Sequence, residues 1–255
     1  LNLSPDHIER HKTLKKYIKS KFKLLKKQCK GNFAFVKKDD RLINQELKLN
    51  KFNGKIIKVN TKKNNNFLKH VANEYFLTET NKENLLFVLK ISKKLKIKNS
   101  SLKKTIDKFK GLKYRQQIIL RRKNLTIIND SKSTSFSSTK GILKQSSNVL
   151  WLLGGVYKKG DKFDLKIRNL NNVRAFIYGK NKSFFNKELK GKVTFKNFEN
   201  LEDALKNIFY LIKTENLNHN TILFSPCAAS FDGFKNFEDR GFYFNRLVKK
   251  YLNAK

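Results

Sequence analysis

The feature that most limits the fold of this chain is a regular alternation of apolar and amphipathic segments in its second half. Short apolar segments, typical of buried strands, lie at residues 125–129, 149–153, 174–178, 193–195 and 221–224. Helical spacing of apolar residues occurs between or after them, at residues 137–144, 201–213 and 236–252. Strands that alternate with helices usually form parallel sheets, because each helix returns the chain to the same edge. We therefore predict an α/β fold with a mostly parallel sheet.

The first half of the chain has a less regular pattern. It predicts a Lys-rich helix over residues 8–30, short strands at 32–36 and 54–59, and helices at 84–95 and 102–109. The pattern breaks at Lys-Gly-Leu-Lys, residues 110–113. We predict one domain over residues 1–110 and a second over residues 111–255.

The charge of the chain allows two interpretations. The sequence has 58 Lys and Arg against 20 Asp and Glu, a formal net charge of +38, and basic patches are typical of nucleic-acid-binding proteins. Here lysine far outnumbers arginine, and the lysines are scattered through every segment. Lys, Asn, Ile and Phe share AT-rich codons, so a biased genome accounts for the excess. We expect no nucleic-acid partner and keep a basic nucleic-acid-binding protein as the alternative function.

Cysteine usage and hydropathy limit the compartment. Cys29 and Cys227 are the 2 cysteines and lie far apart in the sequence, which fits a reducing cytoplasm better than a disulfide framework. No apolar run reaches the roughly 20 residues that a membrane helix needs, so we expect no membrane insertion. The chain contains no Met and begins at Leu1, and we expect an N-terminally truncated, monomeric protein.

A polar loop follows the last predicted strand. Residues 225–233 read Ser-Pro-Cys-Ala-Ala-Ser-Phe-Asp-Gly, and small ligands bind beyond the carboxyl ends of strands in α/β domains. Phe234, Phe237, Phe242 and Leu247 recur at roughly helical spacing, which predicts that the next helix packs on the sheet. A purely structural loop is the alternative, because folds contain many such loops.

Two segments of the chain resemble the Mur ligase family. The first resembles a C-terminal family signature and matches it at Ser225, Pro226, Ser230, Asp232, Phe234, Asn236, Phe237, Arg240 and Gly241. The second, Ile-Asn-Asp-Ser-Lys-Ser-Thr-Ser at residues 128–135, resembles the family's Asn-Asp-Ser-Lys-Ala-Thr-Asn motif, with Ser133 and Ser135 replacing Ala and Asn. The two segments also occur in the family's order.

The resemblance implies the end of a central ATP-binding domain followed by a Rossmann-like domain for the incoming amino acid. The motifs look like those of family members that add D-glutamate to UDP-N-acetylmuramoyl-L-alanine in peptidoglycan synthesis. This implies ATP and Mg²⁺ as cofactors and an acyl-phosphate intermediate. The sequence has no Gly-x-x-x-x-Gly-Lys-(Ser/Thr) phosphate loop. In the family that loop lies upstream, so we expect this chain alone to be inactive. A family member that adds another amino acid is the nearest alternative.

Two residues near the start of the chain are candidate metal ligands and catalytic groups by resemblance. Residues 1–10 resemble a family segment whose histidine binds magnesium, which makes His7 the candidate; a capping or surface histidine is the alternative. Tyr-Ile-Lys-Ser-Lys at residues 17–21 resembles a family segment whose lysine is carbamoylated and organises the metal site. Lys21 is the match, and a solvated surface lysine is the alternative.

The resemblance implies nucleotide-binding roles for Asn81, Asn84, Arg115, Asp130 and Lys132. Thr-Asn-Lys-Glu-Asn at residues 80–84 resembles a family His-Asn-x-x-Asn stretch, although Asn81 also fits a helix N-cap. Gly-Leu-Lys-Tyr-Arg at residues 111–115 resembles the family's interdomain Gly-Leu-Pro-His-Arg, whose arginine reaches the ATP. Lys132 is also a catalytic candidate. A Ser/Thr-rich helix cap is the alternative for residues 130–135.

By the same resemblance, D-glutamate is bound by Thr134, Lys158, Ser230, Phe231 and Phe237, with Phe231 acting through its backbone. Lys158 ends a segment similar to the family's Leu-Gly-Gly-x-x-Lys, which implies an ion pair with a substrate carboxylate. Two carboxylates on the amino acid account for a pocket of ammonium and hydroxyl groups. Phe234 and Phe242 are expected only to hold the last helix in place.

Overall fold

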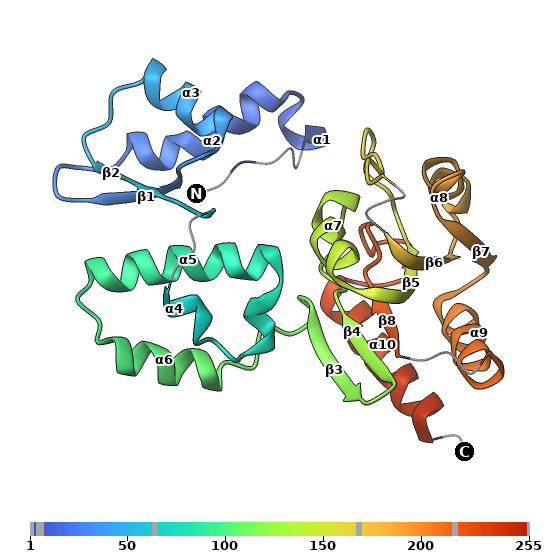
Figure 1. The fold of residues 1–255 in the computed structure, drawn as a ribbon. Helices are drawn as coiled ribbons and strands as arrows, with labels where there is room; N and C mark the ends of the chain where they lie inside the picture. Colours follow the sequence, from blue (N-terminus) through green and yellow to red (C-terminus); the bar gives the residue numbers. More distant parts are fainter. Residues whose placement is uncertain (1–2, 4–7, 63–65, 167–169, 216–218, 254–255) are drawn as a thin grey trace. The chain divides into compact units, whose positions relative to one another are not determined.

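The computed structural model describes residues 3, 8–62, 66–166, 170–215 and 219–253. The chain divides into two compact units, Leu1–Phe109 and Lys110–Lys255, which are coloured blue to green and green to red in Figure 1. The boundary falls at the break in the sequence pattern, where Gly111 adopts a φ of 76°. No helix in the described ranges is long and apolar enough to cross a membrane.

The first unit contains helices around a small parallel sheet. Its elements are α1 (Ile8–His11), α2 (Leu14–Lys26), β1 (Phe33–Lys37), α3 (Arg41–Leu49), β2 (Lys55–Val59), α4 (Asn66–Lys69), the 3₁₀ helix η1 (Glu74–Leu77), α5 (Glu79–Lys94) and α6 (Asn99–Lys108). Strands β1 and β2 pair in parallel. Phe22, Val36 and Ile43 are fully buried, and their side chains join α2, β1 and α3 in one core.

The single helix predicted over residues 8–30 is wrong, because the structure has two helices there. Lys12 adopts a φ of 63°, in the left-handed region, and interrupts the helical path. Thr13 then caps α2, its side chain accepting a hydrogen bond from the backbone N–H of Lys16. Helix α3 had no assignment from the sequence. It is short, and Asp40 caps it by accepting from the N–H of Ile43 at 3.1 Å.

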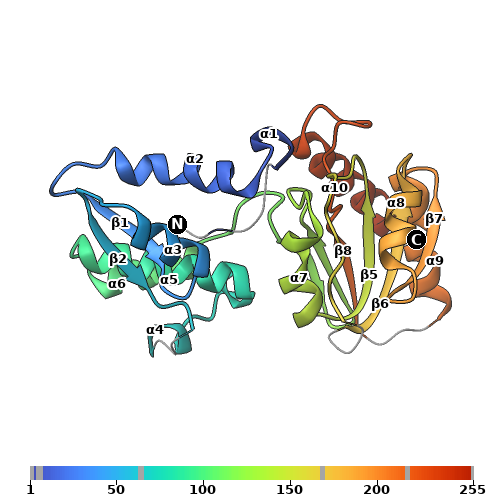
Figure 2. The same ribbon diagram turned by 90° about the horizontal axis from the view of Figure 1, so that it is seen from above.

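The second unit is a six-stranded sheet with helices on both faces (Figures 1 and 2). Its elements are β3 (Gln117–Arg122), β4 (Leu125–Asn129), α7 (Phe136–Gln145), β5 (Ser147–Gly154), β6 (Asn171–Tyr178), α8 (Lys182–Leu189), β7 (Thr194–Phe198), α9 (Leu201–Thr214), β8 (Asn220–Phe224) and α10 (Phe237–Asn253). The strand order is β3-β4-β8-β5-β6-β7. All pairings are parallel except that of β3 with β4, which confirms the predicted mostly parallel sheet.

Alternating residues of the central strands fill two separate cores. In β5, Val149, Trp151 and Leu153 face the core formed with α7 and α8. Leu150 and Leu152 face the core formed with α9 and α10. Successive side chains of a strand point to opposite faces, so a strand covered on both faces is apolar at every position. This explains why these strands were recognisable as continuous apolar runs.

Helix α10 packs on the sheet as predicted, and Leu247 is buried there. The expected contact of Phe242 is wrong, since its side chain is 60% exposed. Phe244 and Val248 are buried beside Leu247 instead. Phe242 lies two residues before Phe244, which turns it to the far side of a helix with 3.6 residues per turn. Phe234 is half-buried and contacts the ring of Tyr243.

Gly241 allows a close contact between α10 and the start of the second unit. A Cβ atom at Gly241 would lie 2.4 Å from a ring carbon of Tyr114. Tyr114 itself is fixed, because it has a φ of 61° and its carbonyl accepts from the N–H of Lys132 at 3.0 Å. The ring therefore occupies the space that any larger residue at position 241 would need.

This contact predicts that Gly241→Ala has opposite effects on the free energy of unfolding when Tyr114 is present and when it is replaced by alanine. In the natural chain Gly241→Ala should lower the free energy of unfolding, because the methyl group displaces the Tyr114 ring. In a Tyr114→Ala background the same change should raise it by about 0.5–1 kcal/mol, because alanine is the better helix residue. Urea denaturation of the four chains measures both effects. Equal destabilisation in the two backgrounds would show that the Tyr114 ring is not the obstacle.

Candidate functional site

Three loops that carry predicted site residues follow three adjacent strands of the second unit. Strand β8 lies between β4 and β5, so the carboxyl ends of all three strands meet at one edge of the sheet. The loop after β4 carries Lys132 and Thr134, the loop after β5 carries Lys158, and the loop after β8 carries Ser230. Ligands of open α/β sheets bind at such an edge, where the connections diverge to opposite sides.

Asp130 fastens the β4 loop to its neighbours. It is 5% exposed, and both carboxylate oxygens accept hydrogen bonds, one from the N–H of Gln116 at 3.1 Å and one from the Ser225 hydroxyl at 3.0 Å. Burial raises the pKa of Asp130 to about 7, while the two hydrogen bonds and the charges of Arg115 and Arg240 lower it. Near neutral pH this carboxyl group is therefore only partly ionised.

Hydroxyl groups extend this network beneath the loops. The Thr139 hydroxyl shares hydrogen bonds with the hydroxyls of Ser225 at 2.6 Å and Ser133 at 2.7 Å. The indole N–H of Trp151 donates to the carbonyl of Ser225 at 2.8 Å. Polar groups from β5, α7 and the β4 and β8 loops are thus linked within a buried region, where each hydrogen bond is costly to lose.

Arg240 connects the β4 and β8 loops to α10. Its side chain is fully buried. Nε donates to the Ser131 hydroxyl at 3.1 Å, and Nη2 donates to the carbonyls of Ser131 at 2.8 Å and Ala228 at 3.0 Å. Burial lowers the pKa of the guanidinium, because removing a cation from water disfavours the charged form. The Ser131 hydroxyl in turn donates to the carbonyl of Phe237 at 2.8 Å.

Two glycines bring the β5 loop against the other loops. Gly154 and Gly155 have φ values of 152° and 124°, which favour glycine. A Cβ at Gly154 would lie 2.2 Å from the carbonyl oxygen of Tyr178, and one at Gly155 would lie 2.5 Å from that of Ala229. Val156 and Ala229 then exchange backbone hydrogen bonds of 3.0 and 2.8 Å. The glycine pair is required by this approach of one backbone to another.

The structure shows these surroundings for the predicted amino-acid-binding residues. Lys132 is half-buried, with Nζ 4.0 Å from the centre of the Phe237 ring. Thr134 is half-buried. Ser230 is buried, and its carbonyl accepts from the N–H groups of Gly233 and Phe234. Phe231 is 75% exposed. Lys158 is half-buried and lies on the β5 loop, on the other side of the Val156–Ala229 pairing from Ser230.

The predicted nucleotide-binding and metal-binding residues occupy varied surroundings. Arg115 is exposed in the second unit. In the first unit, Asn84 is exposed on α5, whereas Asn81 is buried and donates its amide to the carbonyl of Tyr75 at 2.8 Å. The interpretation of Asn81 as an N-cap is wrong, because Thr78 caps α5.

Lys21 is half-buried on α2, with Nζ 5.1 Å from the centre of the Tyr17 ring. His7 lies outside the described residues. Within those residues, no group of three or more His, Cys, Asp or Glu side chains could hold a metal ion.

Arg240, Ser225 and Ser131 connect the loops but had no predicted role. Arg240 and Ser225 matched the family signature, and Ser131 lay inside the second motif. A signal was available for Arg240, since it shares a helix face with Phe237, Phe244 and Leu247, where an arginine must be buried and hydrogen-bonded. For Ser225 and Ser131 the partners lie about 100 residues away, and no local pattern reveals them.

Known proteins have the same order of two units along the chain, in which the second is an α/β unit with motif-bearing loops at one sheet edge. Residues 1–103 match the model of the Mur ligase middle domain. This match confirms the resemblance to the Mur ligase family seen in the motifs of the chain.

Individual relatives of this chain share one enzyme name. The chain is 32% identical over 253 residues to the UDP-N-acetylmuramoylalanine--D-glutamate ligase of Francisella tularensis subsp. novicida, covering 97% of this chain and 58% of that protein. It is 31% identical over 268 residues to the ligase of the same name from Rickettsia felis, covering 98% and 60%. The chain thus spans less than two thirds of the length of these relatives.

Two solved structures share the fold. MurF from Acinetobacter baumannii aligns with a TM-score of 0.69 at 15% identity, covering 97% of this chain and 58% of that one. The UDP-N-acetylmuramate-alanine ligase MurC from Thermotoga maritima aligns with a TM-score of 0.60 at 14% identity, covering 100% and 59%. At such low identity the likeness concerns the fold alone.

The buried Asp130 carboxyl predicts a pH-dependent stability. Its pKa is about 7 in the folded chain against 3.8 as the ordinary value, so the unfolded chain releases this proton first. The folded state therefore loses stability as pH rises from about 4 to about 7. When the pH is raised from about 5 to about 7.5, the free energy of unfolding of the natural chain should fall by about 2 kcal/mol. That of Asp130→Asn should not show this fall, because asparagine does not titrate.

Urea denaturation at the two pH values measures this difference. Asp239→Asn, which alters an exposed carboxylate on α10, is the control and should follow the natural chain. An identical pH slope for Asp130→Asn and the natural chain would contradict the raised pKa.

Proposed function

We propose that this chain provides the amino-acid-binding side of an ATP-dependent ligase that adds D-glutamate to UDP-N-acetylmuramoyl-L-alanine. The observation that carries the proposal is the convergence of Lys132, Thr134, Lys158 and Ser230 on loops at one sheet edge, in a chain 31–33% identical to ligases of that name over 97–98% of its length. The units Leu1–Phe109 and Lys110–Lys255 would be the end of the ATP-binding domain and the amino-acid-binding domain.

The proposed reaction takes place in two steps. The carboxylate of UDP-N-acetylmuramoyl-L-alanine attacks the γ-phosphate of ATP, which forms an acyl phosphate and releases ADP. The amine of D-glutamate then attacks the acyl carbon, forms the amide, and expels phosphate. The residues of this chain would contribute by holding D-glutamate, since correct positioning supplies much of the rate in such a transfer.

The two carboxylates of D-glutamate suit the charges at this edge. Lys132 and Lys158 would attract them, and the hydroxyls of Thr134 and Ser230 would fix their orientation by hydrogen bonds. Phe237 holds the Lys132 ammonium over its ring at 4.0 Å, which limits the positions open to that charge. Phe231 would act through its backbone, because its ring is 75% exposed.

ATP and Mg²⁺ are proposed as cofactors in the cytoplasm. Asn81, Asn84, Arg115 and Asp130 remain the predicted nucleotide contacts, although both oxygens of Asp130 already accept hydrogen bonds within the chain. Mg²⁺ favours oxygen ligands and phosphate groups. His7 and a carbamoylated Lys21 would therefore complete only part of its coordination, with the remainder supplied by ATP and water.

Titration calorimetry with D-glutamate and L-glutamate tests the proposal. We expect this chain to bind the D isomer more tightly. Lys158→Gln should weaken that binding at least tenfold because an ion pair is lost, while Lys159→Gln, at the exposed neighbouring position, should change it less than twofold.

The outcomes separate the alternatives. Tighter binding of a different amino acid would favour a sister ligase of the family. Equal or absent heats with both glutamate isomers, together with tight and salt-sensitive DNA binding, would contradict the ligase and favour a nucleic-acid-binding protein.

A further inference from the structure

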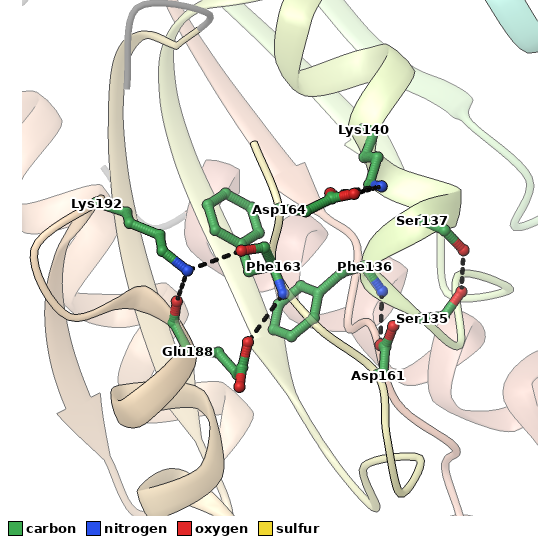
Figure 3. Close-up of polar contacts among 9 residues, drawn as sticks. All are labelled: Ser135, Phe136, Ser137, Lys140, Asp161, Phe163, Asp164, Glu188 and Lys192. Atoms are coloured by element: carbon green, nitrogen blue, oxygen red, sulfur yellow. Dashed lines mark hydrogen bonds and ion pairs between the residues drawn. The ribbon is translucent and has the colours of Figure 1, made fainter. Parts of the chain in front are cut away.

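The loop after β5 returns to the start of α7 through one aspartate. The carboxylate oxygen Oδ2 of Asp161 accepts a hydrogen bond of 2.8 Å from the N–H of Phe136, the first residue of α7 (Figure 3). The N-cap residue of α7, Ser135, makes no side-chain capping bond. The first N–H groups of a helix need outside partners, and a carboxylate there is also favoured by the helix dipole. Asp161 thus caps α7 from 25 residues further along the chain.

The part of the loop beyond Asp161 is fastened independently. Phe163 is 2% exposed, and its ring contacts those of Phe136 and Trp151 at centroid distances of 5.4 and 5.9 Å. Its N–H donates to Glu188 at 3.0 Å, and its carbonyl accepts from Lys192 at 2.8 Å (Figure 3). The loop should therefore remain on the domain when the Asp161 contact alone is removed.

The part of the loop before Asp161 carries Lys158. The N–H of Asp161 donates to the carbonyl of Lys158 at 3.0 Å, which closes a turn between them. Burial raises the pKa of Asp161, while the N–H groups of Phe136 and Lys162 and the charges of Lys158 and Lys140 lower it. The charge of Lys158 thus favours the ionised form of the Asp161 carboxyl group.

Asp161 consequently links two segments that the proposed function assigns to one ligand. Phe136, which it binds, lies two residues after Thr134, and Lys158 is in the turn that Asp161 closes. On the downstream side, Asp164 pairs with Lys140 of α7, but the Asp164 side chain is 61% exposed. The Asp164–Lys140 pair provides a control for the Asp161 contact, since it joins the same loop to the same helix without reaching the N-terminus of α7.

We propose that Asp161 is a positioning residue whose carboxylate sets the distance between Thr134 and Lys158, and thereby the fit of an amino acid with two carboxylates. The proposal rests on the proposed function. It adds a determinant of ligand length: a change in the separation of Thr134 and Lys158 should change the preference for a five-carbon over a four-carbon dicarboxylate.

The test compares Asp161→Asn, Asp161→Ala and Asp164→Asn with the natural chain by calorimetry with D-glutamate and D-aspartate. Asp161→Asn keeps a carbonyl to accept from Phe136 but loses the charge, and Asp161→Ala loses both. We expect D-glutamate binding to weaken about threefold for Asp161→Asn, at least tenfold for Asp161→Ala, and less than twofold for Asp164→Asn. Circular dichroism establishes that each variant is folded at the temperature used.

The ratio of the two affinities distinguishes positioning from general stabilisation. A shift of Lys158 relative to Thr134 should reduce the preference for D-glutamate over D-aspartate at least threefold in Asp161→Ala. A role confined to stability would weaken both ligands equally and leave the ratio unchanged, which would overturn the proposal. An unchanged D-glutamate affinity in Asp161→Ala would also overturn it, while the proposed function stands.

Amide hydrogen exchange separates the failure of this proposal from that of the proposed function. We expect the Phe136 amide to exchange at least tenfold faster in Asp161→Ala, with that of Ile142 in the middle of α7 unchanged. If the natural chain binds no D-glutamate, the proposed function fails, and faster Phe136 exchange would still support the positioning contact. Unchanged Phe136 exchange would overturn that contact in either case.

Discussion

The buried guanidinium of Arg240 is the interaction on which the sheet edge depends. A cation removed from water is expensive unless hydrogen bonds replace its hydration. Here those bonds come from Ser131, on the loop after β4, and Ala228, on the loop after β8. Neither loop can shift without leaving the cation poorly satisfied. The relative positions of Lys132 and Ser230, which these loops carry, are therefore fixed by α10, whose apolar face also contacts the end of β8 through the stacked rings of Phe244 and Phe224.

Because of the strand order, the hydrogen bonds of Arg240 and one further backbone contact are enough to hold all three loops together. Because β8 is inserted between β4 and β5, the last strand of the chain separates two strands joined by α7. Gly154 and Gly155 then allow the third loop to approach within backbone hydrogen-bonding distance of Ala229. Arg240 holds two loops directly, and the Val156–Ala229 pairing attaches the third. Segments spread over more than 100 residues become one surface through a few polar contacts.

Much of the second unit could be predicted from the sequence, because its central strands are apolar at every position and its long helices have one apolar face. The antiparallel β3 was not predictable in this way, since its residues are half-buried or exposed. Phe242 was assigned to the wrong face because helical spacing alone does not fix the phase of a helix. The convergence of the motif loops followed from the rule for parallel strands. The contact of Asp161 with Phe136 could not be predicted from the sequence, because it depends on how the loop returns over 25 residues.

Two aspartates of this edge, Asp130 and Asp161, show how the same side chain could tolerate an anionic ligand in different ways. Asp130 is buried and held by an amide and a hydroxyl, so its pKa of about 7 leaves it partly neutral at the pH where a dicarboxylate is fully ionised. Asp161 faces an N–H at a helix start and the charges of Lys158 and Lys140, so its own charge is offset within the loop. Under the proposed function, repulsion of an incoming carboxylate would be reduced in both cases. The attraction of Lys132 and Lys158 for a dicarboxylate would then be opposed less than the presence of Asp130 and Asp161 alone suggests.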